Sequence, residues 1–222
     1  PDLVVAGAAR LCYSPSTAVS AIDDHPHEDG KRRSFIQRLF QSGHLSPFEH
    51  VSFTFAIDGL SRVTSHQLVR HRLASFSQQS QRYVSQQTEQ VVCPPTVAEN
   101  PEALSLFRET VRQVHNVYRE LQEMGIPKED ARYLLPHGWE TSLIMTMNAR
   151  ELHHFFSLRL CRRAQWEIRR MAAMMLRSVR GKAPMIFEVA GPSCVVEGEC
   201  KEHQPCNRPF TSTEEVINEA NP

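Results

Sequence analysis

The sequence predicts a single domain of mixed α/β class. Residues 51–57 alternate apolar with small or polar side chains, which is the pattern of a half-buried β-strand. Residues 104–124 repeat apolar side chains at steps of three and four, as an amphipathic α-helix does. No segment has the composition of a linker that would divide the 222 residues, so we expect one domain.

The first quarter of the chain is expected to hold an apolar element, a short helix and the strand. The apolar element falls within residues 1–14. Apolar side chains on one face of residues 34–42 predict the helix, and Gly43 supplies its C-terminal stop. The strand of residues 51–57 is expected to end at residues 58–59, where an aspartate precedes a glycine.

A second helix, over residues 60–69, leads into an arginine-rich stretch at residues 70–83. The helix places Gln67 and Arg70 on one face, where both can reach a single ligand. The stretch carries three arginines, a histidine and three serines but no acid. Guanidinium groups bind phosphate through paired hydrogen bonds, which hydroxyl and amide groups can supplement. Composition alone allows a solvated basic turn, a contact for a nucleic-acid backbone or an anion site.

The remainder of the chain is expected to be mainly helical. Residues 91–95 read as an extended piece stopped by proline, and the long helix of residues 104–124 follows. Residues 128–135 predict a short helix between two prolines. Residues 147–179 contain neither proline nor glycine and predict one long helix, continuous or interrupted. A polar tail begins at Gly191.

Composition excludes several classes of protein. Apolar residues make up 41% of the chain, yet no run approaches the roughly 18 residues of a membrane helix, so we expect a cytoplasmic protein without a membrane partner. The net charge is zero, so no overall field attracts nucleic acid. Only four of the 25 basic residues are lysines, and this excess of arginine suits planar anion recognition.

The cysteines and clustered histidines do not favour a metal site. Six cysteines are too scattered for a disulfide framework, so reduced thiols are expected. Cys194, Cys200 and Cys206 enclose a histidine, but they lack the closely spaced pair that is typical of zinc sites. His25 and His27 lie among acids in a polar loop, for which a solvated loop is the favoured interpretation.

Common nucleotide-binding motifs are absent from the sequence. It contains neither G-x-G-x-x-G after a strand nor G-x-x-x-x-G-K-[ST], so a bound nucleotide must be held by arginines and backbone. The order of residues in the arginine-rich stretch resembles the signature of flavin-dependent thymidylate synthases, the ThyX family. Four matching blocks occur in order between about Ala9 and Val189: Gly43-His44-x-Ser46-Pro47-Phe48-Glu49-His50, Arg70-His71-Arg72-x-x-Ser75 continuing to Tyr83, Ala131-Arg132-x-x-Leu135-Pro136, and Asn148-Ala149-Arg150-x-x-x-His154-Phe155-x-x-x-Arg159.

The resemblance implies a ThyX-like α+β fold with a small, mainly antiparallel sheet and long helices. Residues 1–190 would form the catalytic domain and residues 191–222 a polar C-terminal tail. The implied reaction converts dUMP to dTMP, with methylenetetrahydrofolate as carbon donor and FAD reduced by NADPH as hydride source. The family uses no enzyme cysteine as nucleophile. Cys12 lies where some relatives have serine near the flavin, and it is expected to be a packing residue. A homotetramer with active sites shared between subunits is also implied.

The resemblance also implies roles for individual residues. Arg159 is the expected catalytic residue, a cation that favours the N3-ionised pyrimidine. The expected dUMP-binding residues are Gln67, Arg70, Gln78, Gln79, Ser80, Gln81, Arg82, Arg132 and Arg159. The expected FAD-binding residues are His44, Ser46, Glu49, Arg70, His71, Arg72, Leu73, Gln78, Asn148, Arg150 and His154.

Two questions stay open at the level of sequence. Arg150 and Arg159 would point to opposite sides of one ideal helix, about 180° apart. Either residues 148–150 precede the helix, or the two arginines serve different sites. The alternatives to a synthase are a nucleic-acid-binding module, in which Phe76 and Tyr83 stack on bases, and a flavoprotein of the same fold that only oxidises NADPH.

Overall fold

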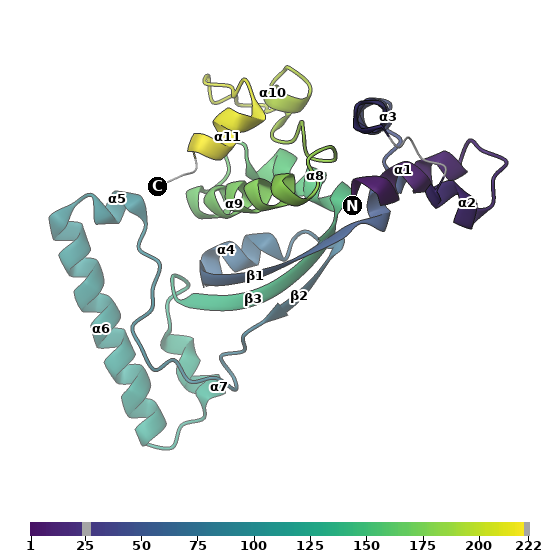
Figure 1. Cartoon of the computed structure of the whole chain (residues 1–222). Helices are drawn as coiled ribbons and strands as arrows, with labels where there is room; N and C mark the ends of the chain where they lie inside the picture. Colours follow the sequence, from purple (N-terminus) through teal and green to yellow (C-terminus); the bar gives the residue numbers. More distant parts are fainter. Residues whose placement is uncertain (24–27, 220–222) are drawn as a thin grey trace. The chain divides into compact units, whose positions relative to one another are not determined.

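The structure, a computed structural model, describes residues 1–23 and 28–219 (Figure 1). The predicted polar loop with His25 and His27 lies mostly outside the described residues. The chain forms two compact units. Unit 1 comprises Pro1–Phe55, His71–Ser75 and Thr146–Pro222, and unit 2 comprises Ala56–Arg70 and Phe76–Met145.

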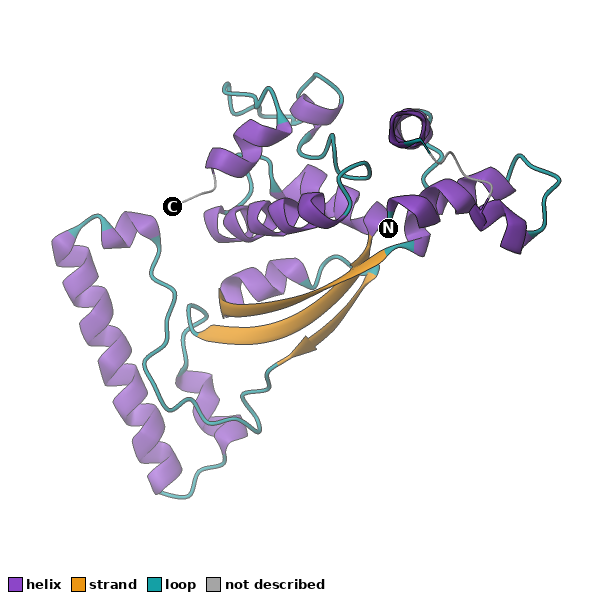
Figure 2. Cartoon of the chain, viewed as in Figure 1, coloured by secondary structure: helices purple, strands orange, loops and turns teal. Residues whose placement is uncertain are grey.

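A three-stranded antiparallel sheet contains β1 (Ser52–Ser61), β2 (Ala74–Gln78) and β3 (Glu140–Asn148), in the order β1-β3-β2 (Figure 2). The small antiparallel sheet with long helices, and hence the mixed α+β class, is confirmed. The sequence predicts only β1 of the three strands. The prediction of helix at residue 147 is wrong, because Met147 is buried in β3.

The predicted alternation of β1 is confirmed, but its predicted end is wrong. Phe53, Phe55 and Ile57 are half-buried, while the residues between them are exposed. The strand continues through Gly59, which adopts a positive φ of 69°. Only glycine takes this conformation at little cost, so the strand bends here without stopping.

Unit 1 is mainly helical around an aromatic core. Its helical elements are α1 (Asp2–Leu11), α2 (Ala18–Asp23), α3 (Asp29–Gln41), η1 (Ser46–His50), α8 (Ala149–Arg159), α9 (Trp166–Lys182), α10 (Ser193–Val196) and α11 (Thr213–Glu219). Phe48, Phe155, Phe156 and Phe187 are fully buried in this core. The predicted helix at residues 34–42 is confirmed, although it begins earlier, at Asp29.

Side-chain caps explain why the predicted long helix of residues 147–179 is divided. The Asn148 side chain accepts a hydrogen bond from the Glu151 backbone N–H, at 2.8 Å, so α8 begins after it. The Gln165 side chain accepts from the backbone of Glu167 and Ile168 in the same way, so α9 begins after Gln165. The interrupted alternative is therefore the correct one.

The C-terminal residues pack within unit 1 despite their polar composition. Phe210, Val216 and Ile217 are buried, and α11 contacts α9. The Arg162 guanidinium lies 3.9 Å from the Phe210 ring centroid, and Arg180 forms a 2.7 Å ion pair with Glu214. These contacts hold the end of the described chain against α9.

Unit 2 contains α4 (Arg62–Leu68), α5 (Pro95–Ala98), α6 (Pro101–Glu123), α7 (Lys128–Ala131) and η2 (Arg132–Leu134). The predicted long helix is confirmed by α6, whose apolar face packs on Trp139 and Leu135. The predicted helix of residues 128–135 is divided into α7 and η2. None of the described helices in either unit has the length and apolar composition that a membrane-spanning segment requires.

We predict that Asn100→Ala lowers the free energy of unfolding by about 1 kcal/mol. The Asn100 Oδ1 atom accepts from the backbone N–H groups of Glu102 and Ala103, both at 3.1 Å, and alanine leaves them without this partner. Urea unfolding measures the change. The control Ser105→Ala, on the exposed face of the same helix, should not destabilise the protein, because alanine is the better helix former. Equal stability of both variants would contradict the prediction.

Candidate functional site

A cavity of about 730 Å³ in unit 1, called here the α8 cavity, contains five of the residues predicted to bind flavin. These are Glu49 on η1, Leu73, Asn148 at the end of β3, and Arg150 and His154 on α8. The Asn148 cap sets where α8 begins, and so sets which face Arg150 and His154 occupy. The wall also includes Phe40, Leu45, His153, Ser157, Gly191, Ser193, Val196 and Glu197, together with Glu151.

Arg150 supplies the cation of the α8 cavity. It pairs with Glu49, and both side chains are about half exposed, so solvent screens the pair and its contribution to stability is small. A phosphate group can therefore compete for Arg150. Apolar side chains of Phe40, Leu45 and Leu73 lie in the same wall. A cation beside apolar surface and amide groups fits a flavin dinucleotide.

Two side chains of α8, Glu151 and Arg159, are linked through His71; Glu151 and His71 are buried, and Arg159 is half-buried. The Arg159 Nε atom donates to the His71 Nε2 atom at 3.0 Å. The His71 Nδ1 atom lies 3.2 Å from the Glu151 Oε1 atom. Burial lowers the pKa of His71 most, and the positive charge of Arg159 and the neighbouring His154 lower it further, whereas Glu151 raises it. Burial also lowers the pKa of Arg159.

The structure excludes one of the two alternatives for the arginines of α8. Arg150 lies in the helix, so the alternative that residues 148–150 all precede the helix is wrong. Arg150 lines the α8 cavity, whereas Arg159 contacts His71. The two arginines therefore have different surroundings in this chain.

Six predicted flavin residues do not line the α8 cavity: His44, Ser46, Arg70, His71, Arg72 and Gln78. His44 contacts the Tyr13 hydroxyl at 3.2 Å, Ser46 begins η1, and Arg72 is exposed in a turn. The sequence missed Ser157, although it lies one helical turn after His154. It also missed the cavity residues after Gly191, for which no spacing signal exists.

Unit 2 contains a smaller pocket of about 320 Å³, called here the basic pocket. Arg132 and Gln81, both predicted to bind dUMP, line it together with Arg62, His66, Tyr133, Leu135, Pro136 and His137. No aspartate or glutamate is among the described residues that line it. The sequence-based prediction missed Arg62, His66 and His137, because none of them lies in one of the four motif blocks.

Arg62 is poorly neutralised in the basic pocket. One of its terminal nitrogens reaches the Gln79 carbonyl at 3.4 Å, but its buried Nε has no hydrogen-bond partner within the described residues. Burial lowers the pKa of Arg62, and repulsion from Arg132 lowers it further. Two nearby cations with an unsatisfied donor and no acid are suited to an anion.

The other predicted dUMP residues in unit 2 do not line the basic pocket. The Arg82 Nε donates to Glu129 at 2.8 Å, and this bond raises the pKa of Arg82. Gln78 donates to the Thr141 hydroxyl at 3.2 Å. Gln67 lies near the end of α4, and Gln79, Ser80 and Arg70 lie in or beside turns. The structure thus joins Arg132 to Gln81 but does not bring the whole predicted set into one pocket.

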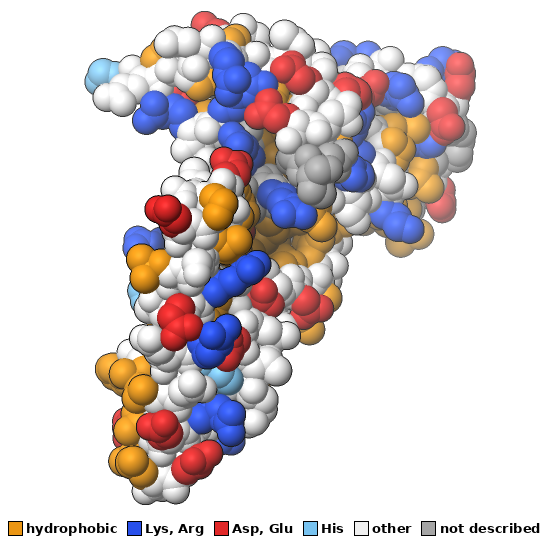
Figure 3. Space-filling view, turned by 90° about the vertical axis from the view of Figure 1, so that its left-hand side faces the viewer, with side chains coloured by type: hydrophobic (Ala, Val, Ile, Leu, Met, Phe, Trp, Pro, Cys, Tyr) orange, Lys and Arg blue, Asp and Glu red, His pale blue; other side chains and the backbone are white. Residues whose placement is uncertain are grey.

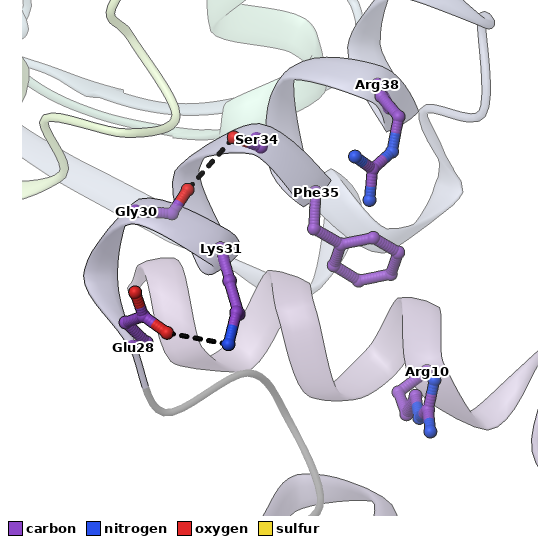
Figure 4. Close-up of a pocket in the computed structure, with 7 residues that line it drawn as sticks. All are labelled: Arg10, Glu28, Gly30, Lys31, Ser34, Phe35 and Arg38. Atoms are coloured by element: carbon purple, nitrogen blue, oxygen red, sulfur yellow. Dashed lines mark hydrogen bonds and ion pairs between the residues drawn. The ribbon is translucent and has the colours of Figure 1, made fainter.

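A further pocket of about 610 Å³ lies in unit 1, beside α1 and α3 (Figure 4). The Phe35 ring projects into it, and the cations there are Arg10, Arg38 and Lys31, the last of which pairs with Glu28 at 2.7 Å. Basic and acidic side chains are interspersed on the face shown in Figure 3, in keeping with a net charge of zero. Within residues 1–23 and 28–219, no group of three or more His, Cys, Asp or Glu side chains is placed to hold a metal ion.

Comparison with known proteins identifies the class to which this fold and these sites belong. The family described as thymidylate synthase complementing protein matches residues 1–185. The chain belongs to this family, the flavin-dependent thymidylate synthases or ThyX proteins. These enzymes methylate dUMP to dTMP with FAD, and NADPH and methylenetetrahydrofolate are their co-substrates. The alternatives of a nucleic-acid-binding module and a simple oxidase are not favoured.

Relatives in particular organisms agree over most of the chain. The flavin-dependent thymidylate synthase of Geobacter sulfurreducens is 48% identical over 204 residues, covering 91% of this chain and 87% of that protein. The Clostridium tetani enzyme is 44% identical over 220 residues, with 91% and 86% covered. The crystal structure of the UMP/dUMP methylase PolB of Streptomyces cacaoi, bound with 5-Br dUMP, is similar at a TM-score of 0.74. It is 29% identical, and the match covers 84% of this chain and 88% of that one.

We predict that His153 makes the fold sensitive to acid. The His153 ring packs against Phe40 and Phe187 and donates from Nε2 to the Ile186 carbonyl, and burial lowers its pKa to about 4. Its ordinary value is 6.5, so the unfolded chain takes up the proton first as the pH falls. The free energy of unfolding should therefore fall by about 3 kcal/mol between pH 6.5 and pH 4.

The variant His153→Gln isolates this effect, because glutamine can donate to the same carbonyl but does not titrate. Urea unfolding of both proteins across the same pH range measures the effect. The free energy of unfolding of the variant should fall by about 3 kcal/mol less than that of the wild type. Parallel losses in the two proteins would contradict the prediction.

Proposed function

We propose that this chain carries out the reductive methylation of dUMP by binding the substrate's 5′-phosphate in the basic pocket and FAD in the α8 cavity. The substrate assignment rests on one observation. Arg62 and Arg132 lie close together in a pocket whose described lining contains no acid. A phosphate dianion satisfies both guanidinium groups and relieves their mutual repulsion. His66 and His137, whose ring centroids lie 5.2 Å apart, add polar edges to this pocket.

The residues of the α8 cavity divide the binding of FAD among them. Arg150 would hold a phosphate of the dinucleotide, and Asn148 and His154 would offer hydrogen bonds to its polar edges. Phe40, Leu45 and Leu73 would cover apolar surface and exclude water. When bound and reduced by NADPH, FAD supplies the hydride of the reaction.

Arg159 is the proposed catalytic residue. A fixed guanidinium stabilises negative charge on the pyrimidine, and this charge makes C5 more nucleophilic toward the incoming carbon. His71 holds the Arg159 Nε in place, so little reorganisation is needed when the charge develops.

The proposal includes a homotetramer with active sites shared between subunits. Exposed apolar side chains on the N-terminal helices support an assembly, since a monomer would leave them in water. They are Leu3, Val4, Leu11, Val19 and Ile22. A cytoplasmic location and the division into a catalytic domain and a tail stay predictions.

We predict that Arg159→Ala lowers kcat by roughly 100- to 1,000-fold while FAD stays bound. Release of tritium from C5 of labelled dUMP, with methylenetetrahydrofolate and NADPH present, measures turnover, and visible absorbance measures bound flavin. Arg163→Ala removes a neighbouring exposed arginine and should keep normal turnover. Normal tritium release by Arg159→Ala would show that Arg159 does not have the proposed catalytic role.

We predict that Arg62→Met and Arg132→Met each weaken dUMP binding by roughly 10- to 100-fold. Each variant loses a charge-assisted hydrogen bond to phosphate, so the affinity for deoxyuridine should not change. Calorimetry with nucleotide and nucleoside gives both affinities. Arg119→Met, an exposed arginine of α6 paired with Glu123, is the matched control. Equal losses for dUMP and deoxyuridine would show that the basic pocket does not hold the phosphate.

A further inference from the structure

Glu151 is a buried acid for which the proposed function provides no role. It lies in the first turn of α8, and its side chain is only 6% exposed, compared with 3% for His71. Burying a carboxylate costs several kcal/mol unless its charge is paired or hydrogen-bonded. Its hydrogen bond goes to His71, which in turn contacts Arg159.

The direction of each hydrogen bond in this chain follows from chemistry. The guanidinium Nε of arginine carries a hydrogen and can only donate. The His71 Nε2 atom must therefore offer its lone pair to Arg159, at 3.0 Å. A neutral imidazole has one hydrogen, so that hydrogen lies on Nδ1 and is donated to Glu151.

Helix capping does not explain Glu151. The spacing Asn148-x-x-Glu151 is that of a capping box, in which the glutamate reaches back to the backbone of the capping residue. Here the Asn148 side chain caps the helix, but the Glu151 carboxylate turns to His71 instead. Helix capping alone would not require the Glu151 carboxylate to be buried, because an exposed glutamate can make the same capping contact.

We infer that Glu151 is a positioning residue that holds His71 in its neutral Nδ1–H form and thereby fixes the guanidinium of Arg159. This inference rests on the catalytic role proposed for Arg159. It assigns to Glu151 an indirect part in turnover, through the orientation of a cation that must meet the pyrimidine in one geometry. Glu151 also contributes to the wall of the α8 cavity, but its carboxylate is bonded to His71, so in this role it acts through Arg159.

Protonation of His71 would break the arrangement. A hydrogen on Nε2 would point at the hydrogen of Arg159 Nε, and the two cations would repel each other. Among the described residues, the charged and titratable groups facing His71 are Glu151, Arg159 and His154, all on α8. Of these, only Glu151 favours the protonated ring. Removal of its charge should therefore lower the pKa of His71 further.

Three variants of the FAD-loaded enzyme test the inference. Glu151→Gln keeps an oxygen acceptor for Nδ1–H but removes the charge, and Glu151→Leu removes both. Glu188→Gln neutralises a partly exposed acid of unit 1 whose partners are Arg33 and Gln37, so it controls for loss of charge alone. Long-range proton–nitrogen NMR reports the tautomer and the pKa of His71, and steady-state kinetics separate kcat from KM for dUMP.

The wild type and Glu151→Gln should both show the Nδ1–H tautomer, with a lower His71 pKa in the variant and an unchanged one in Glu188→Gln. Glu151→Leu should lower kcat by roughly 10- to 100-fold, as expected for the loss of one hydrogen bond to a charged group, with FAD retained and KM little changed. An Nε2–H tautomer in the wild type, or normal kcat in Glu151→Leu, would overturn the inference.

The inference stays testable if Glu151→Leu does not fold, because Glu151→Gln then decides it. An unchanged His71 pKa in that variant would refute the coupling. Failure of the inference about Glu151 can also be distinguished from failure of the proposed function. If Arg159→Ala is inactive while the Glu151 variants behave like Glu188→Gln, only the positioning role is lost. If Arg159→Ala is itself active, the catalytic assignment fails first.

Discussion

One capping interaction positions most of the chemistry in unit 1. The Asn148 side chain ends β3 and begins α8 by accepting the Glu151 N–H, so it sets the rotation of every side chain on the helix. Arg150, His154 and Ser157 then share one face, which lines the α8 cavity. Glu151 lies at the edge of this face, Arg159 lies on the opposite side of the helix, and both contact His71. One strand-to-helix junction therefore separates residues proposed for the flavin from the residue proposed for catalysis.

The arginines of the chain differ in how their charge is neutralised, and this difference separates structural from functional positions. Arg82 and Arg162 have carboxylate partners, as a folded surface requires. Arg62 and Arg132 instead meet each other in a pocket without a described acid. Arg159 donates to the His71 imidazole, which orients the guanidinium. Positive charge without a carboxylate partner is costly to a fold, so its presence in the basic pocket favours a function in binding anions.

Local sequence predicted the elements whose stability is local. The long helix α6 shows its own apolar period and its own N-cap, and β1 shows its own alternation. Strand β3 was missed because Ile144 is exposed, so an apolar run at residues 143–145 hides the alternation of buried Thr141, Leu143, Met145 and Met147. Strand β2 was missed because it is short and its pairing with β3 comes from a distant part of the chain.

The sequence by itself determined the family, the reaction and the α+β class, because ordered motif blocks persist whatever surrounds them. It also identified Arg132, Arg150 and His154, which lie within those blocks. Only the tertiary structure brought Arg62 to Arg132 and Glu151 to His71. Helical spacing predicts which residues share a face, but the partner opposite that face comes from a segment roughly 70 or 80 residues away in sequence. Which buried charges meet is therefore a property of the packed fold.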